Sequence, residues 1–211
     1  MKTQDLIAAL STDMGAVIDL RRSLGLALLV GGLISAALFG LTIGVRPDLS
    51  EALRTWRFDS KIVATLGALL AALAVGLPLL RPGGTPGARA IWLAAPLATL
   101  AAGVGAEILA VPSDRWGARL MGVNAQHCLT LIPLLSIAPL AALLWAMRRG
   151  APESPARAGA IAGLAAAGFA ATLYATNCTD DSPLFVALWY SLATLLVVAA
   201  GALIGGRLLR W

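Results

Sequence analysis

The chain has 211 residues, of which 59% are hydrophobic and only 13% are charged, and its mean hydropathy is +0.83. A soluble domain carries roughly a quarter charged residues, so this composition excludes a water-soluble globular protein. The net charge of +5 and the pI near 10.0 would suit a nucleic-acid-binding protein, but the basic residues stand at the ends of apolar runs, where they act as topology signals. We therefore predict an integral membrane protein without direct nucleic-acid contact.

The first 22 residues come before any long apolar run and have the pattern of a short amphipathic helix. The apolar residues that recur at helical spacing are Leu6, Ile7, Leu10, Met14, Val17 and Ile18. Such a helix could lie on the inner membrane surface, with Arg21 and Arg22 near anionic head groups. The acidic residues that flank its apolar face favour a protein groove instead.

Six long uncharged runs follow this segment. They are Ser23–Val45, Ile62–Leu80, Ala90–Ala106, Leu120–Met147, Ala158–Thr179 and Ser182–Gly206. A helix that crosses a bilayer needs about 20 apolar residues, and the third run gains length because it resumes after Glu107. Continuous runs rich in Leu and Ala exclude a transmembrane β-barrel. We predict an all-α integral membrane protein, with residues 1–22 as a cytoplasmic amphipathic segment and residues 23–211 as a six-helix transmembrane bundle whose first helix is an uncleaved anchor.

The distribution of basic residues predicts the orientation of this bundle. With a cytoplasmic amino terminus, the inner side holds Lys2, Arg21, Arg22, Arg81, Arg89, Arg148, Arg149, Arg157, Arg207 and Arg210. The outer side holds six basic residues, namely Arg46, Arg54, Arg57, Lys61, Arg115 and Arg119. Because inner loops carry the excess of Lys and Arg, both termini are predicted to be cytoplasmic.

Small residues and prolines inside the runs predict how the helices pack. Glycines four residues apart, which let helix backbones approach closely, occur at Gly40/Gly44, Gly159/Gly163 and Gly201/Gly205. Pro133 and Pro139 fall inside the fourth run. Each proline leaves a backbone carbonyl that a neighbouring helix must satisfy.

Glu107 is an acidic residue close to a predicted span, and ionisable residues in membranes are candidates for function. It lies about one helical turn from Pro112, so its carboxylate could instead reach the outer interface. Its presence leaves open an alternative function, that of a small-solute or ion transporter which uses Glu107 and the Gly-rich helices.

The two cysteines, Cys128 and Cys178, both fall at the outer ends of helices in this topology. The fourth and fifth helices are joined by a short inner loop, which would bring both thiols to the same rim, and a disulfide needs Cα atoms within roughly 7 Å. The pair could be a static disulfide, two unrelated small residues, or a sensor that changes between dithiol, disulfide and metal-bound states. Together with His127, two thiolates would suit a soft divalent metal.

Several enzyme motifs are absent from the sequence. There is no Cys-x-x-Cys pair, no His-Glu-x-x-His, no P-loop and no Gly-rich dinucleotide fingerprint. We therefore predict that the protein is not an enzyme and needs no cofactor.

The chain resembles the NrsF family of six-helix membrane anti-sigma factors over nearly its whole length. The resemblance is carried by MKTQDLIAALSTD at Met1–Asp13, by the stretch from His127 to Cys178, by FVALWY at Phe185–Tyr190 and by GGRLLRW at Gly205–Trp211. It implies a bacterial inner-membrane protein whose cytoplasmic amino-terminal helix, Lys2–Leu20, holds an extracytoplasmic-function sigma factor.

The resemblance further implies that Cys128 and Cys178 face the periplasm and sense stress, with a heavy-metal ion or an oxidant as the signal. On this hypothesis, modification of the cysteines changes the packing of the last three helices, and the fourth helix, with its prolines, carries the change to residues 1–22. The chain departs from the family pattern at Leu20-Arg21-Arg22-Ser23, where other members often have a proline.

Overall fold

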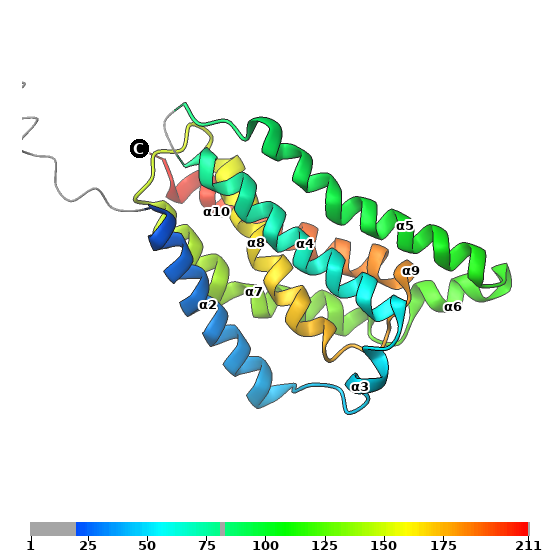
Figure 1. Cartoon of the computed structure of the whole chain (residues 1–211). Helices are drawn as coiled ribbons and strands as arrows, with labels where there is room; N and C mark the ends of the chain where they lie inside the picture. The colour runs from blue at the N-terminus through cyan, green and yellow to red at the C-terminus, as the bar shows by residue number, and fades with distance from the viewer. Residues whose placement is uncertain (1–19, 81–82, 211) are drawn as a thin grey trace, which may run out of the picture.

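A computed structural model describes residues 20–80 and 83–210, and this part of the chain is helical and contains no strand (Figure 1). Six of its helices are long and apolar enough to cross a membrane, so the predicted all-α fold with six spans is confirmed. The predicted amphipathic helix falls almost entirely on residues 1–19, outside the described residues.

The spans have the following bounds. They are α2 (Leu20–Thr42), α4 (Trp56–Leu79), η1 with α5 (Gly87–Leu93 and Ala94–Ala110), α7 (Ala125–Met147), α8 (Pro155–Ala175), and α9, η3 and α10 (Pro183–Phe185, Val186–Tyr190 and Ser191–Leu208). Short helices lie in the connections, namely α3 (Leu49–Ala52), η2 (Ser113–Arg115) and α6 (Trp116–Met121).

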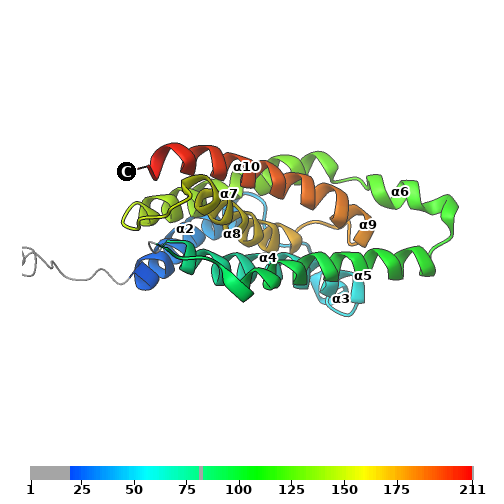
Figure 2. The same ribbon diagram turned by 90° about the horizontal axis from the view of Figure 1, so that it is seen from above.

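Helix α8 is the centre of the bundle, and α2, α4, α7 and α10 all contact it (Figures 1 and 2). With the exception of Tyr174, every buried residue of α8 is an alanine or a glycine. Helix α5 packs mainly on α4 and lies at the edge of the bundle. Because the buried side chains of α8 are small, the backbones of its four neighbours can approach it closely.

The connections between helices gather at two ends of the bundle. Residues 43–55, 111–124 and 176–182 form one end, which we call the cysteine end because it holds Cys128 and Cys178. The start of α2, the α7–α8 connection and the end of α10 lie at the other end, called here the opposite end (Figure 1). Successive spans thus run antiparallel, as the predicted topology requires.

Two helix boundaries differ from the uncharged runs for identifiable reasons. Helix α4 begins at Trp56, six residues before the run that starts at Ile62, because Thr55 caps the helix by accepting the Phe58 N–H at 3.3 Å and the charged residues of the first turns remain helical. Helix α7 begins at Ala125 rather than at Leu120. Gly122, with φ of +55°, ends α6 there and separates the two helices.

The contact between α8 and α10 depends on glycines on both helices. A Cβ atom on Gly159 would lie 2.2 Å from the carbonyl oxygen of Gly201, and one on Gly205 would lie 2.6 Å from the Cα of Gly159. The close packing predicted from Gly159/Gly163 and Gly201/Gly205 is confirmed. The first motif behaves differently, because a Cβ on Gly40 or on Gly44 would meet nothing within 4 Å.

A serine on α2 satisfies the backbone carbonyl that Pro139 leaves free. Proline has no N–H to donate to the carbonyl four residues earlier, which here belongs to Leu135. The Ser35 hydroxyl donates to that oxygen at 2.7 Å, and Ser35 is fully buried. The predicted satisfaction by a neighbouring helix is confirmed for this proline.

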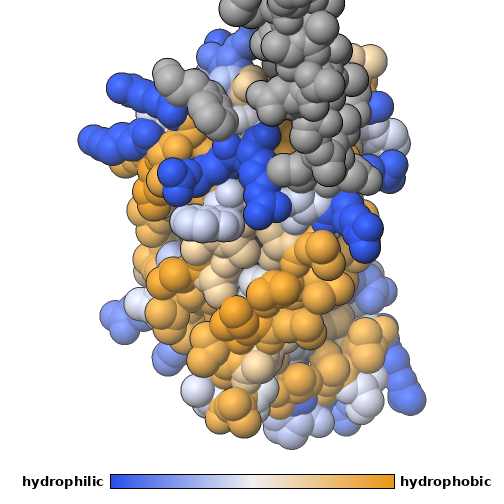
Figure 3. All heavy atoms as spheres, turned by 90° about the vertical axis from the view of Figure 1, so that its left-hand side faces the viewer, coloured by the Kyte–Doolittle hydropathy of each residue, from blue (hydrophilic) through white to orange (hydrophobic). Residues whose placement is uncertain are grey.

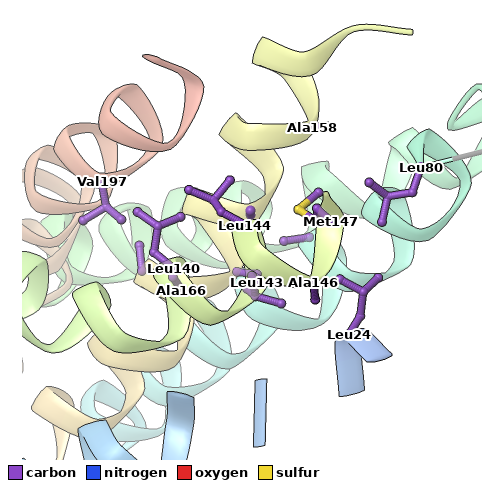
Figure 4. Packing of buried hydrophobic residues seen from close by; sticks show 14 of the residues in the cluster. Leu24, Leu80, Leu140, Leu143, Leu144, Ala146, Met147, Ala158, Ala166 and Val197 are labelled. Atoms are coloured by element: carbon purple, nitrogen blue, oxygen red, sulfur yellow. The ribbon is translucent and has the colours of Figure 1, made fainter. Parts of the chain in front are cut away.

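Buried side chains of α2, α4, α7, α8 and α10 pack together near the opposite end (Figure 4). They include Leu24, Leu80, Leu140, Leu143, Leu144, Met147 and Val197. The outside of the bundle is also apolar: one face is largely hydrophobic below a rim of charged residues (Figure 3). On α2, for example, Leu26, Leu29 and Leu33 are each more than half exposed. Such a surface is suited to contact with lipid tails.

Candidate functional site

Cys128 and Cys178 meet inside the cysteine end. Cys128 lies in the first turn of α7, and Cys178 lies in the turn that follows α8. Both thiols are free, and the two residues are 0% and 1% exposed. They share one buried cluster with Phe39, Tyr174 and Tyr190, among others. The structure therefore brings the two cysteines to the same rim, as the predicted topology requires.

Backbone hydrogen bonds fix the turn that carries Cys178. The Cys178 N–H donates to the carbonyl of Tyr174 at 2.9 Å, which continues the last turn of α8. The segment after α2 packs alongside, because the Arg46 N–H donates to the Thr176 carbonyl at 3.1 Å and the Asn177 side-chain amide donates to the Gly44 carbonyl at 3.0 Å. The sulfur atom of Cys178 thus has a defined position relative to α8.

Asp180 joins the same turn to the start of α7. Its Oδ2 accepts hydrogen bonds from the backbone N–H groups of Val123 and Asn124, at 2.9 and 2.8 Å, and from the Asn124 side chain at 2.9 Å. The Asn124 carbonyl in turn accepts the Cys128 N–H at 2.9 Å. Asp180 therefore couples the positions of the two cysteines.

The neighbouring carboxylate, Asp181, forms ion pairs with two basic side chains. Its Oδ1 lies 2.5 Å from the Nζ of Lys61, and its Oδ2 lies 2.7 Å from an Nη1 of Arg46. Both cations also donate to the carbonyl of Cys178, at 2.9 Å from Lys61 and 3.2 Å from Arg46. The Lys61 side chain is completely buried. Arg46 also pairs with the exposed carboxylate of Asp48, which lowers the pKa of Asp48 to about 2.

A second buried ionic cluster lies around Glu107. Its two carboxylate oxygens each lie 2.7 Å from an arginine, Arg57 on α4 and Arg119 on α6. Ser182 also donates to the carboxylate at 3.3 Å. Because Glu107 is completely buried, its charge is compensated by these partners rather than by water. It links three separate segments of the cysteine end.

Two tyrosines complete the surroundings of the thiols. The hydroxyls of Tyr174 and Tyr190 are buried and make no hydrogen bond of regular geometry within the described residues. Both interact electrostatically with Cys128 and Cys178. Tyr190 belongs to η3, a π-helical turn at the start of the last span. Such turns often occur at functional sites.

The two thiols have different electrostatic surroundings. The pKa of Cys178 is lowered to about 7, chiefly by the adjacent Cys128 thiol and further by the positive charge of Lys61, which together outweigh the opposing effect of burial. A thiolate is the reactive form of cysteine. This pair of neighbouring thiols can therefore form a disulfide or bind a soft metal ion.

The other predicted site residues are not part of this cluster. His127 is exposed although it precedes buried Cys128. No group of three or more His, Cys, Asp or Glu side chains among residues 20–80 and 83–210 is placed to hold a metal ion, so Cys128, Cys178 and His127 do not form a ligand set here. The predicted apolar face, Leu6, Ile7, Leu10, Met14, Val17 and Ile18, lies outside the described residues.

The sequence pattern did not identify the two basic side chains of the site or its two tyrosines. Lys61 and Arg46 stand near helix ends, where basic residues commonly act as topology signals. Tyr174 and Tyr190 bound the stretch YATNCTDDSPLFVALWY, in which polar residues interrupt apolar runs. A polar turn of this kind beside a lysine at the start of a span is the signal that could have identified the network.

Comparison with known proteins supports the resemblance seen in the sequence. A family model described as "Negative regulator of sigma F" matches residues 10–211. The chain is 37% identical, over 218 aligned positions, to the anti-sigma-F factor NrsF of Caulobacter vibrioides (strain NA1000 / CB15N). It is 35% identical to the probable anti-sigma-F factor NrsF of Azospira oryzae. Both alignments cover 100% of each chain, and no solved structure matches.

Proposed function

Because the chain belongs to the NrsF family of negative regulators of sigma F, we propose that it is an inner-membrane anti-sigma factor for an extracytoplasmic-function sigma factor. Residues 1–22 bind the sigma factor in the cytoplasm. Cys128 and Cys178 face the periplasm, and their oxidation or binding of a heavy-metal ion releases the sigma factor. The observation that carries this proposal is the burial of two adjacent thiols at the end of the bundle away from the start of α2.

The separation of the two ends supports this division of roles. Helix α2 begins at Leu20, at the opposite end from the cysteines (Figure 1). This arrangement supports the proposal that residues 1–22 and the two cysteines lie on opposite sides of the membrane. A signal received by the thiols has to pass along the spans to reach the sigma factor.

The ion pairs support a cytoplasmic location for both termini. Four basic residues between the first two uncharged runs weaken the charge bias. Three of them, Arg46 in the connection after α2 and Arg57 and Lys61 at the start of α4, form ion pairs with carboxylates of the cysteine end. These residues thus have a structural role, and the remaining excess of arginines at the opposite end agrees with the positive-inside rule.

A single charge on the predicted apolar face tests the sigma-binding segment. We expect Leu10→Asp to weaken binding of the sigma factor about 30-fold, equivalent to about 2 kcal/mol, because a buried anchor of an interface would become charged. Ser11→Asp introduces the same charge one residue later, off the apolar face, and should bind as the parent does. The measurement is the dissociation constant of each full chain in nanodiscs for candidate extracytoplasmic-function sigma factors. Equal affinities for the two variants would refute this binding surface.

Serine substitutions test the sensing role of the cysteines. We expect Cys128→Ser and Cys178→Ser chains to bind the sigma factor normally but to retain it when hydrogen peroxide or Cd²⁺ is added. The reason is that neither single-thiol chain can form the internal disulfide or hold an ion between two thiolates. Release of the labelled sigma factor from the nanodisc-embedded chain is measured by fluorescence anisotropy. Normal release from both variants would contradict the sensing role while leaving the anti-sigma role intact.

A further inference from the structure

We propose that Cys178 is the thiol that reacts first with an oxidant, that Cys128 is the thiol that resolves it, and that buried Lys61 positions Cys178 for this reaction. This inference rests on the proposed sensing function and assigns an order of events within it. It depends on the difference in surroundings between two thiols that are equally buried.

The geometry around Cys178 places positive charge on one side of the pair. The Nζ of Lys61 donates to the Cys178 carbonyl at 2.9 Å, and an Nη1 of Arg46 donates to the same oxygen at 3.2 Å. Both groups are held in place by Asp181. A fixed ammonium beside this turn favours the thiolate form of the nearby sulfur. The groups that act on Cys128 are Cys178, Tyr174 and Asp180, none of which is positively charged.

The groups that face Cys178 come from every element around it. They are Lys61 from α4, Arg46 from the segment after α2, Asp180 and Asp181 from its own turn, Tyr174 from α8, Tyr190 from η3 and Cys128 from α7. The carboxylates oppose a thiolate, but Asp181 is paired with two cations, and Asp180 is bonded to Val123 and Asn124. The two phenols can donate to a sulfur anion, and their hydroxyls are otherwise unpartnered in the described chain.

A hollow opens beside the turn that carries Cys178. It has a volume of about 670 Å³ and is lined in part by Thr179, Asp180, Asp181 and Ser182, which directly follow Cys178 in sequence. A small neutral oxidant such as hydrogen peroxide can therefore approach this turn.

The reaction needs an oxidant of the hydroperoxide class. The Cys178 thiolate attacks one peroxide oxygen, so that an S–O bond forms, the O–O bond breaks, and the departing hydroxide or alkoxide takes up a proton. Cys128 then loses its proton and attacks the Cys178 sulfenic acid. The S–S bond forms as the S–O bond breaks, and the leaving hydroxide takes the proton as water. The two thiols together lose two electrons and two protons, and the hydroperoxide is reduced to an alcohol or water.

The experiment compares single-thiol forms of the full chain in nanodiscs. Cys128→Ser keeps a hydroxyl donor beside Cys178, and Cys178→Ser is the matched counterpart. Each chain is treated with hydrogen peroxide across a pH series, the sulfenic acid is trapped with dimedone, and the adduct is quantified by mass spectrometry. We expect Cys178 to react faster than Cys128 at neutral pH, because the fixed charge of Lys61 lies on its side of the pair. Equal rates, or a faster Cys128, would overturn the order.

Variants of Lys61 in the Cys128→Ser chain test the positioning role. We expect Lys61→Met to slow oxidation of Cys178 and to move the midpoint of its pH profile upward, whereas Lys61→Arg keeps the parent profile. Lys61→Gln removes the charge but keeps a polar side chain, and it decides the question if Lys61→Met does not fold. An unchanged profile in Lys61→Met or in Lys61→Gln would refute the role of Lys61. Sigma-factor release is measured separately, so a failure of the sensing function is distinguishable from a failure of this assignment.

Discussion

Replacing Gly159 by alanine is expected to lower the free energy of unfolding by about 3 kcal/mol, at the upper end of the usual cost of overpacking. The added Cβ would lie 2.2 Å from the Gly201 carbonyl oxygen and 2.8 Å from the Cα of Gly205. Both neighbours are backbone atoms, so no side chain can move aside, and α10 has to separate from α8. Since α10 is the largest contact partner of α8, this change should disturb the centre of the bundle. The measurement is the unfolding midpoint in mixed micelles of increasing sodium dodecyl sulfate, followed by circular dichroism.

Gly105→Ala is the matched control for this experiment. Gly105 also lies inside a span, on α5, but an added Cβ there would meet nothing within 4 Å. Alanine has the higher helix propensity by up to about 1 kcal/mol, so the control should be as stable as the parent or slightly more so. Similar midpoints for the two variants would show that the α8–α10 contact does not limit stability.

Glu107→Gln is expected to destabilise the fold by about 3 kcal/mol, the lower end of the cost of breaking a buried ion pair. The substitution keeps the shape of the side chain but removes the charge that holds Arg57 and Arg119. The lower end applies because the two arginine side chains are 29% and 36% exposed and can regain contact with water. The same denaturation in mixed micelles measures the change.

The control for Glu107→Gln is Glu51→Gln, which removes the same charge at the same end of the bundle. Glu51 is exposed, on α3, and its substitution should change stability by less than about 0.5 kcal/mol. A parent-like midpoint for Glu107→Gln would mean that the ionic cluster contributes little to stability.

These variants also address the transporter alternative. Transport that uses Glu107 requires a carboxylate which exchanges its partners, and here both oxygens are bonded to arginines from other segments. The geometry favours a structural cross-link. Ion flux into proteoliposomes that is lost in Glu107→Gln, at a temperature where this variant is folded, would restore the alternative.

The parts of the fold that depend on composition could be predicted from the sequence. The parts that depend on contacts between side chains far apart in sequence could not. Uncharged length fixes the number of spans, and short inner connections fix which helices are neighbours, so the meeting of Cys128 and Cys178 follows. The uncharged run starts at Ile62, whereas α4 starts at Trp56, because charged residues in its first turns interrupt the run but not the helix. Those charges are compensated by carboxylates far away in sequence, such as Asp181 for Lys61.

The glycine motifs show the same limit of prediction from sequence for a single helix–helix contact. The motif at Gly159/Gly163 packs tightly against Gly201/Gly205, whereas a Cβ atom on Gly40 or on Gly44 would meet nothing within 4 Å. The spacing defines a small-residue surface on a helix, but the surface of the partner helix decides whether the two approach. The π-helical turn at Val186–Tyr190 has no sequence pattern of its own for a similar reason, since it depends on how one helix fits against the others.

The composition of the buried face of α8 has a consequence for its mechanical behaviour. Alanine and glycine have no side-chain rotamers, so packing them costs no rotamer entropy, and they also offer no rotamer changes that could absorb a local displacement. Tyr174 is the one buried residue of α8 with such freedom, and it lies beside the thiols. A push on its ring therefore cannot be absorbed by the other buried side chains of α8. We expect it to displace the helix as a unit, so that its far end near Ala158 shifts with the near one.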